Sequence, residues 1–349
     1  MRRIENTNIE SQSPLPPPDE VKRELPLPKD LAETVLAGRD FMRSILDGRD
    51  KRLLVIVGPC SIHSEEGTLE YAARLRDLSA KVSKHLFLVM RAYFEKPRTT
   101  LGWKGLIYDP ELNGSYNIEA GLKLARKLLL GIVAEGVPTA TEVLDPIMAQ
   151  YIADLISWAA IGARTTESQM HRQLASGLSM PVGFKNSTDG SIRVAVEAIK
   201  TAAAKHSFIG ITGAGNTAVF RTKGNKYCHL VLRGGAGDPN YGSEHIAFAC
   251  ELMRKSKIHP SIVIDCSHAN SARQPERQLD VLRDVLQQRS SGNESLRGVM
   301  LESNLKTGRQ ELQEGRSPEP GISITDPCLG WEETEAALLD AARFLGRQH

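Results

Sequence analysis

LLVIVGPC (53–60) and IVIDCSH (262–268) are short hydrophobic runs rich in β-branched residues, and each ends in a reactive side chain, Cys60 or His268. Six further runs share this pattern, and helix-like stretches separate them. They are LFLVMR (86–91), TATE (139–142), AAIGAR (159–164), PVGFK (181–185), HLVLR (229–233) and GVMLE (298–302). Short apolar runs between helical stretches are typical of buried parallel strands. Eight of them predict an α/β protein with a closed (β/α)8 TIM barrel.

The last residue of each run is the first indication of function. Every run ends in Cys, Arg, Glu, Lys or His. A buried strand rarely ends in a charged side chain unless a ligand or a partner lies there. Because the active site of such a barrel lies at the carboxyl ends of its strands, the eight endings predict one shared site.

The regions outside this alternation predict an extension and an insertion. Residues 1–30 are polar and rich in proline, which predicts disorder or an extended arm, and residues 30–48 have the periodicity of a helix. We therefore divide the chain into an N-terminal arm and helix (1–51), with an oligomerisation or regulatory role, and a catalytic barrel (52–349). Residues 207–223 form two strand-like runs around a glycine-rich turn, which predicts a β-hairpin inserted before the sixth strand.

Composition excludes several classes of protein. The formal net charge of the 349 residues is +2, which argues against binding to nucleic acid or to a membrane surface. The chain lacks an apolar run of about 18 residues, the length that spans a bilayer, and its polar start predicts no signal peptide. The five cysteines are irregularly spaced without a CxxC pair, which is typical of a reduced, cytoplasmic protein.

Four residues form a candidate metal site: Cys60, His268, Glu302 and Asp326. Each has an ordinary structural explanation when taken alone, such as a small buried filler, a histidine bonded to a carbonyl group, or a helix cap. Together they follow the first, seventh and eighth strands, and the first and eighth strands are neighbours in a closed barrel. A thiolate, an imidazole and two carboxylates suit Mn, Fe, Zn or Co better than Mg.

A second group of residues is cationic: Arg91, Lys96, Arg98, Arg164, Lys185 and Arg233. Solvated charges at the rim are the ordinary explanation, but four of the six end apparent strands, where mutual repulsion calls for anions. The group predicts one or two small, multiply anionic ligands, with Glu142 among the cations.

The EKPRTT loop (95–100) suits a sugar phosphate. The glycine-rich TGAGNTA (212–218) precedes a strand rather than a helix, so it does not predict a dinucleotide site.

Several blocks closely resemble the type I, microbial 3-deoxy-D-arabino-heptulosonate 7-phosphate (DAHP) synthases, from about Arg52 to the C-terminal helix. The blocks are GPCSIH (58–63), EKPRTT (95–100), GWKGLI (102–107), IGARTTESQ (161–169), ASGLSMPVGFKN (175–186), LRGG (232–235), DCSHAN (265–270), SITD (323–326) and GWE (330–332). The resemblance implies condensation of phosphoenolpyruvate, erythrose 4-phosphate and water to DAHP and phosphate, the first step towards chorismate and the aromatic amino acids.

The resemblance also implies roles for individual residues. The metal ligands would be Cys60, His268, Glu302 and Asp326, with Asp326 also beside the substrates. The phosphoenolpyruvate site would comprise Arg91, Lys96, Glu142, Ala163, Arg164, Lys185 and Arg233, and the erythrose 4-phosphate site Lys96, Pro97, Arg98 and Thr99. Lys96, Cys60 and His268 would be the catalytic residues. The resemblance further implies one divalent ion, a homodimer or homotetramer, and an aromatic amino acid as a possible effector.

Departures from the family pattern lie away from the chemistry, and several fall in the implied effector pocket. Its candidate residues are Gln173, Ser179, Phe208, Gly210 and Gly213. Gln173 replaces a usual Glu, and the run from Gly210 to Gly213 replaces Ser-Val-Thr-Lys. Because a lysine is lost and two glycines are gained, we expect weak or altered inhibition by Phe, Tyr or Trp.

Three other functions remain as alternatives. A sibling synthase would use arabinose 5-phosphate, but its loop is of the KANR type rather than KPRT. A non-catalytic, anion-binding or regulatory paralogue is disfavoured by the four metal-binding residue types, and a metal-dependent aldolase is a weaker option. The sequence leaves open the native metal, the effector, the choice between dimer and tetramer, and a primary or specialised pathway.

Overall fold

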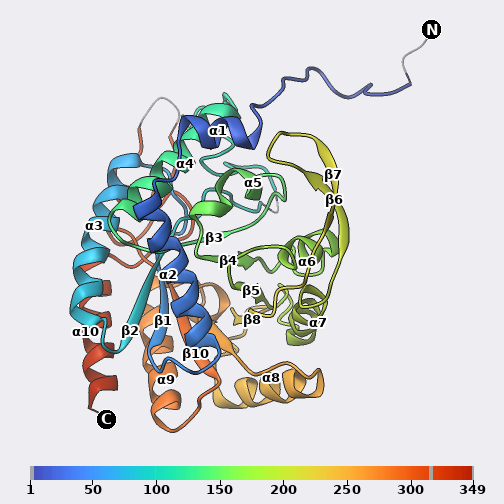
Figure 1. Ribbon diagram of the computed structural model, residues 1–349. Coiled ribbons are helices and arrows are strands. Elements are labelled where there is room, and N and C mark those ends of the chain that lie inside the picture. Colours follow the sequence, from blue (N-terminus) through green and yellow to red (C-terminus); the bar gives the residue numbers. More distant parts are fainter. Residues whose placement is uncertain (1–3, 99, 314–316, 348–349) are drawn as a thin grey trace.

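The computed structural model describes residues 4–98, 100–313 and 317–347, and its centre is a closed barrel of eight parallel strands (Figure 1). The strands are β1 (Leu53–Gly58), β2 (Leu86–Arg91), β3 (Thr139–Glu142), β4 (Trp158–Ile161), β5 (Val182–Lys185), β8 (Cys228–Leu232), β9 (Ile262–Asp265) and β10 (Leu296–Glu302). The barrel closes where β1 pairs with β10 on one side and with β2 on the other. The predicted TIM barrel is confirmed.

Helices follow the strands and cover the outside of the barrel. They are α3 (Glu65–Val82), α4 (Ile118–Ala134), α5 (Ala149–Ile152), α6 (Gln169–Ala175), α7 (Ile192–Ala202), α8 (Ser243–Lys255), α9 (Gln278–Ser290) and α10 (Trp331–Gly346). The Ser64 hydroxyl and the Asn117 amide oxygen cap α3 and α4 by accepting hydrogen bonds from backbone N–H groups. The apolar spacing of PIMAQYIADLISW (146–158) predicts one continuous helix between β3 and β4, and this prediction is wrong in length. Only α5 and a 3-10 turn (Ala153–Leu155) form there, because Trp158 already belongs to β4.

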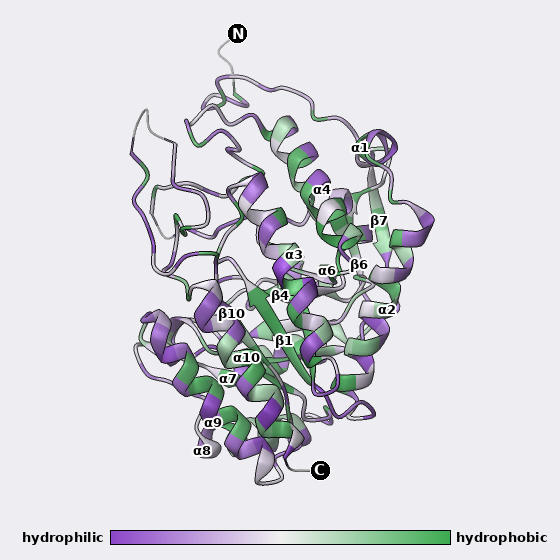
Figure 2. Ribbon diagram, turned by 90° about the vertical axis from the view of Figure 1, so that its left-hand side faces the viewer, coloured by the Kyte–Doolittle hydropathy of each residue, from purple (hydrophilic) through white to green (hydrophobic). Residues whose placement is uncertain are grey.

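Side chains alternate in direction along the strands. This alternation directs the charged residues at the strand ends into the opening of the barrel at the carboxyl ends of its strands. A cluster of apolar side chains, including Leu54, Val89 and Met300, fills the barrel interior. Arg91 and Glu302 follow Val89 and Met300 by two positions, so their side chains point the same way, one layer further along. Figure 2 shows β1 as hydrophobic along its length, whereas the surrounding helices carry both kinds of residue.

The N-terminal region is more ordered than predicted. Residues 18–24 form helix α1 (Pro18–Glu24), whereas disorder or an extended arm was the prediction for residues 1–30. Pro18 stands in the first turn, where its fixed φ favours a helix, and Val21 is fully buried. Helix α2 (Lys29–Leu46) then adds Met42 and Ile45 to the cluster inside the barrel, so it packs where the strands begin.

The predicted hairpin insertion is confirmed. Strands β6 (Ser207–Ile211) and β7 (Thr217–Arg221) pair with each other, outside the barrel and before β8. The turn of the hairpin lies beside the start of α1, where the Asp19 N–H donates to the Gly213 carbonyl at 2.8 Å (Figure 1). None of the helices in the described part of the chain has the length and apolar character needed to cross a membrane.

Candidate active site

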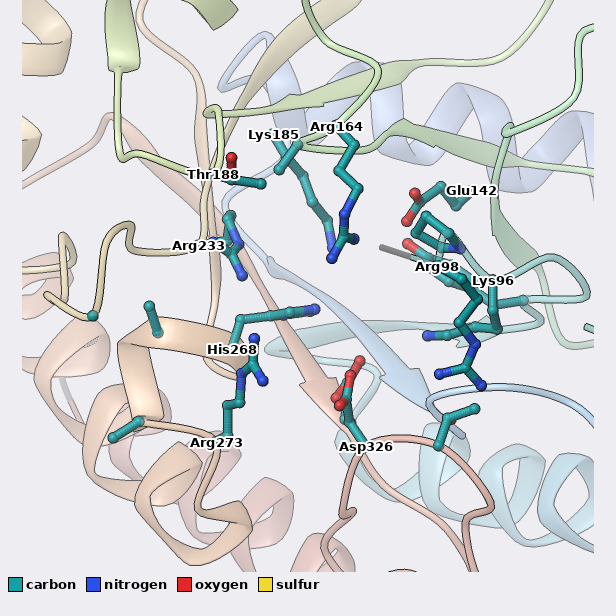
Figure 3. Close-up of a pocket in the computed structure, with 18 of the residues that line it drawn as sticks. Lys96, Arg98, Glu142, Arg164, Lys185, Thr188, Arg233, His268, Arg273 and Asp326 are labelled. Atoms are coloured by element: carbon teal, nitrogen blue, oxygen red, sulfur yellow. The ribbon is translucent and has the colours of Figure 1, made fainter. Parts of the chain in front are cut away.

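A cavity of about 910 Å³ lies at the carboxyl ends of the barrel strands. We call it the mouth pocket. Seven Lys or Arg side chains line it, against the three carboxylates Glu142, Glu302 and Asp326. The cations are Arg91, Lys96, Arg98, Arg164, Lys185, Arg233 and Arg273. In Figure 3 the labelled side chains converge on one space from several different strand ends. A pocket with this excess of positive charge suits ligands that carry several negative charges.

Arg91 and Glu302 form the buried floor of the mouth pocket. Their side chains are 1% and 2% exposed, and Arg91 Nη2 donates to Glu302 Oε1 at 3.0 Å. The Arg91 guanidinium also lies 3.9 Å from the centre of the Tyr93 ring. Burial lowers the pKa of Arg91, but the neighbouring Tyr93 and Glu302 outweigh it, so its pKa is raised. The arginine is therefore held charged at the bottom of the site.

A second buried ion pair joins Lys185 to Asp265. Lys185 Nζ lies 2.9 Å from Asp265 Oδ2, and both side chains are almost completely buried. Burial alone would raise the pKa of Asp265, but Lys185 and His268 lower it well below its usual value. The Ser267 hydroxyl also donates to this carboxylate, at 2.6 Å. Asp265 was not among the candidates from the sequence, and it fixes two of them.

Three of the four candidate metal ligands lie together. One ligand atom each from Cys60, Glu302 and Asp326 lies within 4.8 Å of the other two. Lys96 Nζ lies 3.1 Å from Cys60 Sγ. Burial, with the charge of Glu302, raises the pKa of Cys60 to about 11. Burial acts in the same direction on Asp326, but Lys96 and His268 lower the pKa of that carboxyl. The group has the composition of a site for a divalent transition metal.

His268 lies in the same pocket but is not a member of this three-residue group. Its Nδ1 is 2.7 Å from the Ser267 hydroxyl and 3.1 Å from Asp265 Oδ2. The side chain points into the mouth pocket (Figure 3). The backbone at His268 has φ +58°, an uncommon value for a residue other than glycine. Such strain often occurs at functional sites, and here it accompanies a ring held by two partners.

The loop after β2 brings Lys96, Pro97 and Arg98 to the pocket. The Lys96 N–H donates to the Lys104 carbonyl at 2.9 Å, and Arg98 Nε donates to the Trp103 carbonyl at 2.7 Å. The predicted residue Thr99 lies outside the described residues. The loop is thus braced against the segment that follows it, with its two cations facing the cavity.

Comparisons with known proteins identify the family of this chain. Residues 25–339 match the DAHP synthetase I family. The chain belongs to this family. Its relatives include the Tyr-sensitive phospho-2-dehydro-3-deoxyheptonate aldolase of Salmonella typhimurium strain LT2, 52% identical over 85% of this chain and 83% of that protein. The Phe-sensitive enzyme of Escherichia coli K12 is 53% identical over 83% of each chain. The Trp-sensitive enzyme of Escherichia coli O157:H7 is 54% identical over 82% of each chain.

A solved structure shares the whole architecture. The phospho-2-dehydro-3-deoxyheptonate aldolase of Francisella tularensis SCHU S4 superposes with a TM-score of 0.95 at 45% identity, covering 98% of this chain and all of that one. Membership of the DAHP synthetase I family makes this chain an enzyme, and it confirms the resemblance drawn from the sequence blocks.

The five candidate effector residues lie on α6, before β5 and on the hairpin. Gln173 belongs to α6, and the Ser179 carbonyl accepts a hydrogen bond from Arg43 Nη2 at 2.6 Å. Phe208 stacks on Phe220 with ring centres 5.7 Å apart, and Gly210 lies two residues further along β6, paired with Ala218 of β7. A Cβ atom at Gly213 would lie 2.2 Å from Asp19 Oδ1. The glycine at 213 therefore permits the close approach of α1, and the lysine usual in the family would displace Asp19.

Sequence reasoning missed several residues of the pocket region. Arg273 and Thr188 line the mouth pocket, and Asn186 accepts a hydrogen bond from the Arg233 N–H at 2.9 Å. Asp265 and Asn186 both stand inside quoted blocks, DCSHAN and ASGLSMPVGFKN, so the signal was present in the sequence. Arg273 stands three residues beyond DCSHAN, and position along the chain alone does not show that it turns back to the pocket.

Glu95, also missed, is a buried carboxyl group directly before the Lys96 loop. It is 4% exposed and accepts hydrogen bonds from the Leu144 and Asp145 N–H groups. Burial, with the charge of Asp145, raises the pKa of Glu95 to about 8. The folded protein therefore keeps this proton at pH values where the unfolded chain, with an ordinary pKa of about 4.3, has lost it.

Because of this pKa difference, the ionisation of Glu95 makes the free energy of unfolding depend on pH. Because the folded pKa is raised, the free energy of unfolding falls as pH rises from about 4.3 towards 8, and this contribution then levels off. We expect Glu95→Gln to remove this slope, on the order of a few kcal/mol across the window. Urea unfolding at pH 5, 6, 7 and 8 measures it. An equal slope in the variant and the parent would contradict the assignment.

Proposed function

We propose that the enzyme is a DAHP synthase that joins phosphoenolpyruvate and D-erythrose 4-phosphate. The observation that carries this proposal is the mouth pocket, where seven Lys or Arg side chains, with Arg91 and Lys185 buried among them, lie around a three-residue group of metal-binding type. C3 of phosphoenolpyruvate bonds to the aldehyde carbon, water adds to C2, and the bond from C2 to the phosphate oxygen breaks. The products are DAHP and inorganic phosphate, at the start of the shikimate pathway to chorismate and the aromatic amino acids.

The cations of the mouth pocket hold phosphoenolpyruvate in this proposal. Arginine pairs with carboxylate and phosphate through two parallel hydrogen bonds, and lysine adds a point charge. We assign this binding to Arg91, Arg164, Lys185 and Arg233, with the Ala163 backbone contributing and Glu142 beside them. Since the two ion pairs already fix Arg91 and Lys185, little further ordering is needed when the substrate enters.

Lys96 has two roles in the proposal. With Pro97, Arg98 and Thr99 it forms the erythrose 4-phosphate site, where Arg98 takes the phosphate group. The Lys96 ammonium, which neighbouring Cys60 and Glu302 help to keep protonated against the effect of burial, donates a proton to the alkoxide that forms from the aldehyde. Pro97 restricts the backbone of the loop, so both cations stay directed at the pocket.

One divalent ion (Mn, Fe, Co or Zn) fits the donor set beside Lys96. Cys60, Glu302 and Asp326 supply one sulfur and two carboxylate groups, and two of these side chains are buried. We propose His268 as the fourth ligand, through the ring nitrogen that Ser267 and Asp265 leave free. Such an ion supplies Lewis-acid polarisation of a carbonyl oxygen. Cys60 and His268 are therefore catalytic as proposed ligands of this ion.

A steady-state assay with an aldehyde panel tests the proposal. We expect phosphate release with phosphoenolpyruvate and erythrose 4-phosphate, and little with arabinose 5-phosphate. Preference for the five-carbon aldehyde would make the chain a sibling synthase. Absence of phosphate release with every aldehyde and metal would favour a non-catalytic, anion-binding paralogue.

Gly162→Ala tests the position of Glu142. A Cβ atom at residue 162 would lie 2.1 Å from Glu142 Oε1, so the carboxylate must move, whereas the fold need not. We expect kcat/KM to fall by about tenfold, the equivalent of one charge-assisted interaction, with an unchanged Tm. Gly242→Ala is the matched control, because the nearest atom to its Cβ is 3.7 Å away. Equal activity of the two variants would show that Glu142 does not contribute to the substrate site.

Inhibition by aromatic amino acids is the next expectation. The relatives carry the names Tyr-, Trp- and Phe-sensitive, which supports an aromatic effector in this family. We expect weak or altered inhibition here, because Gly210 and Gly213 replace larger residues and α1 lies against the turn. Titration of activity with Phe, Tyr and Trp measures it. Ordinary micromolar inhibition by one of them would refute the expectation.

We further propose that residues 1–51 form an oligomerisation and regulatory arm of a cytoplasmic homodimer or homotetramer. The support is the contact between α1 and the hairpin and the position of α2 before the first strand, outside the alternation of strands and helices. Light scattering of the full chain distinguishes the two assemblies, and a monomer would contradict the proposal.

A further inference from the structure

A second cavity, of about 620 Å³, lies at the opposite end of the barrel, and we call it the basal pocket. Its walls come from residues 50–52 before β1, residues 84–85 before β2, the connection from α9 to β10, and the end of α10. All these strand-flanking residues lie at the amino-terminal end of the barrel, or just inside it. The basal pocket is therefore separate from the mouth pocket and shares no residue with it.

The charge of the basal pocket is unbalanced. Five Lys or Arg side chains and His85 line it, against the two carboxylates of Asp50 and Glu294. Asp50 already pairs with Arg52 at 2.6 Å, and Glu294 pairs with Lys51 at 3.1 Å. Among the described residues, Lys84, Arg289 and Arg297 form no ion pair within 4.0 Å. Glu294 acts on both arginines at longer range, together with Asp50 on Arg289 and Asp47 on Arg297.

Arg297 is the central side chain of this group. It is only 5% exposed, and its Nε is buried without a hydrogen-bond partner among the described residues. Gly48 lies against the guanidinium, because a Cβ atom there would be 2.6 Å from Arg297 Nη2. A buried donor without an acceptor costs free energy. An anion in the pocket would supply the missing acceptor.

The neighbouring guanidinium groups are held in place. Arg289 Nη1 donates to the Leu296 carbonyl at 2.5 Å, and its Nη2 donates to the Lys51 carbonyl. Arg52 lies over the Phe41 and Phe87 rings, at 4.9 and 5.2 Å from their centres. Burial lowers the pKa of both Arg289 and Arg297, and each pKa would rise again beside a bound anion. The pocket is thus already arranged before a ligand arrives.

We propose that the basal pocket is a binding site for a small phosphorylated metabolite, with Arg297, Arg289 and Lys84 around the phosphate group. Guanidinium groups bind phosphate oxygens through paired hydrogen bonds. A lysine on the rim adds a positive charge that does not depend on one exact orientation. The volume accommodates a compound larger than phosphate itself. Because the two pockets lie at opposite ends of the barrel, both can be occupied at once.

Calorimetric titration with pyrophosphate at constant ionic strength tests the proposal. Arg164→Gln in the parent weakens binding at the mouth pocket, so the remaining site can be measured by itself. We expect one site per chain, which Arg297→Gln weakens by about tenfold, the equivalent of one charge-assisted hydrogen bond. Lys84→Gln, an exposed change that leaves the fold intact, should weaken it by about threefold. The matched control is Lys81→Gln on α3, which should have no effect.

Two further arms complete the experiment. Titration with phosphoenolpyruvate and with ribose 5-phosphate distinguishes a substrate of the enzyme from another phosphorylated metabolite as the occupant, and binding of either supports the site. Unchanged affinity in both Arg297→Gln and Lys84→Gln, or no remaining site in the Arg164→Gln parent, would overturn the proposal. Should Arg297→Gln fail to fold by circular dichroism, Lys84→Gln decides the outcome. None of these readouts depends on the catalytic activity.

Discussion

Replacing Cys60 with alanine is expected to remove metal-dependent turnover. The side chain supplies the only sulfur in the group that it forms with Glu302 and Asp326, and it is fully buried beside Lys96. We expect kcat to fall by more than about 100-fold, because even residues behind a metal ligand change affinity or activity by ~10- to 100-fold. Metal content after chelation and reloading, measured by mass spectrometry, should fall in parallel.

The control for this variant is Cys228→Ala. Cys228 is also buried, but it starts β8, at the other end of the strand from the mouth pocket. We expect it to keep its metal and its activity, apart from a modest loss of stability. Full activity of Cys60→Ala after chelation and metal return would show that the ligand assignment is wrong.

Lys185→Met is expected to reduce both stability and substrate affinity. It removes the lysine that pairs with Asp265, a carboxylate with no exposed surface. That buried charge is then left with its contacts to Ser267 and His268 and the more distant Arg91 and Arg233. Removing one partner of a buried ion pair costs about 3–5 kcal/mol. Urea unfolding measures this loss at pH 7, and KM for phosphoenolpyruvate should rise by at least about tenfold.

The double variant Lys185→Met with Asp265→Asn separates the two effects. Removing the unpaired charge should restore most of the stability, whereas affinity for phosphoenolpyruvate should stay low. Lys255→Met, at an exposed ion pair with Glu251, is the matched control and should change stability by less than about 1 kcal/mol. A stable single variant with unchanged KM would contradict both roles of Lys185.

The barrel was predictable because each strand carries its own signal. Runs such as LLVIVGPC are apolar enough to require burial on both faces, and the hairpin has a clear glycine-rich turn. Helix α1 was missed because its proline-rich surroundings indicate disorder, whereas α1 packs on α5, which is distant in sequence, and Val21 is fully buried. The short α5 was overestimated because a helical period continues into Trp158, which tertiary packing assigns to β4.

The members of the site were largely predictable, but their partners were not. Chain position shows that Arg91 and Glu302 end strands, and closure of the barrel puts both strands beside β1. It does not show that the two side chains meet at 3.0 Å, or that Asp265 holds both Lys185 and His268. Such pairings depend on side-chain direction at the mouth, which no local pattern encodes.

The most direct test of the account measures phosphate release and bound metal in one preparation. The chelated protein, given phosphoenolpyruvate and erythrose 4-phosphate, should be inactive, and activity should return in proportion to added Mn, Fe, Co or Zn up to one ion per chain. Full turnover of the thoroughly chelated protein, or no phosphate release with any of these metals, would contradict the central claim.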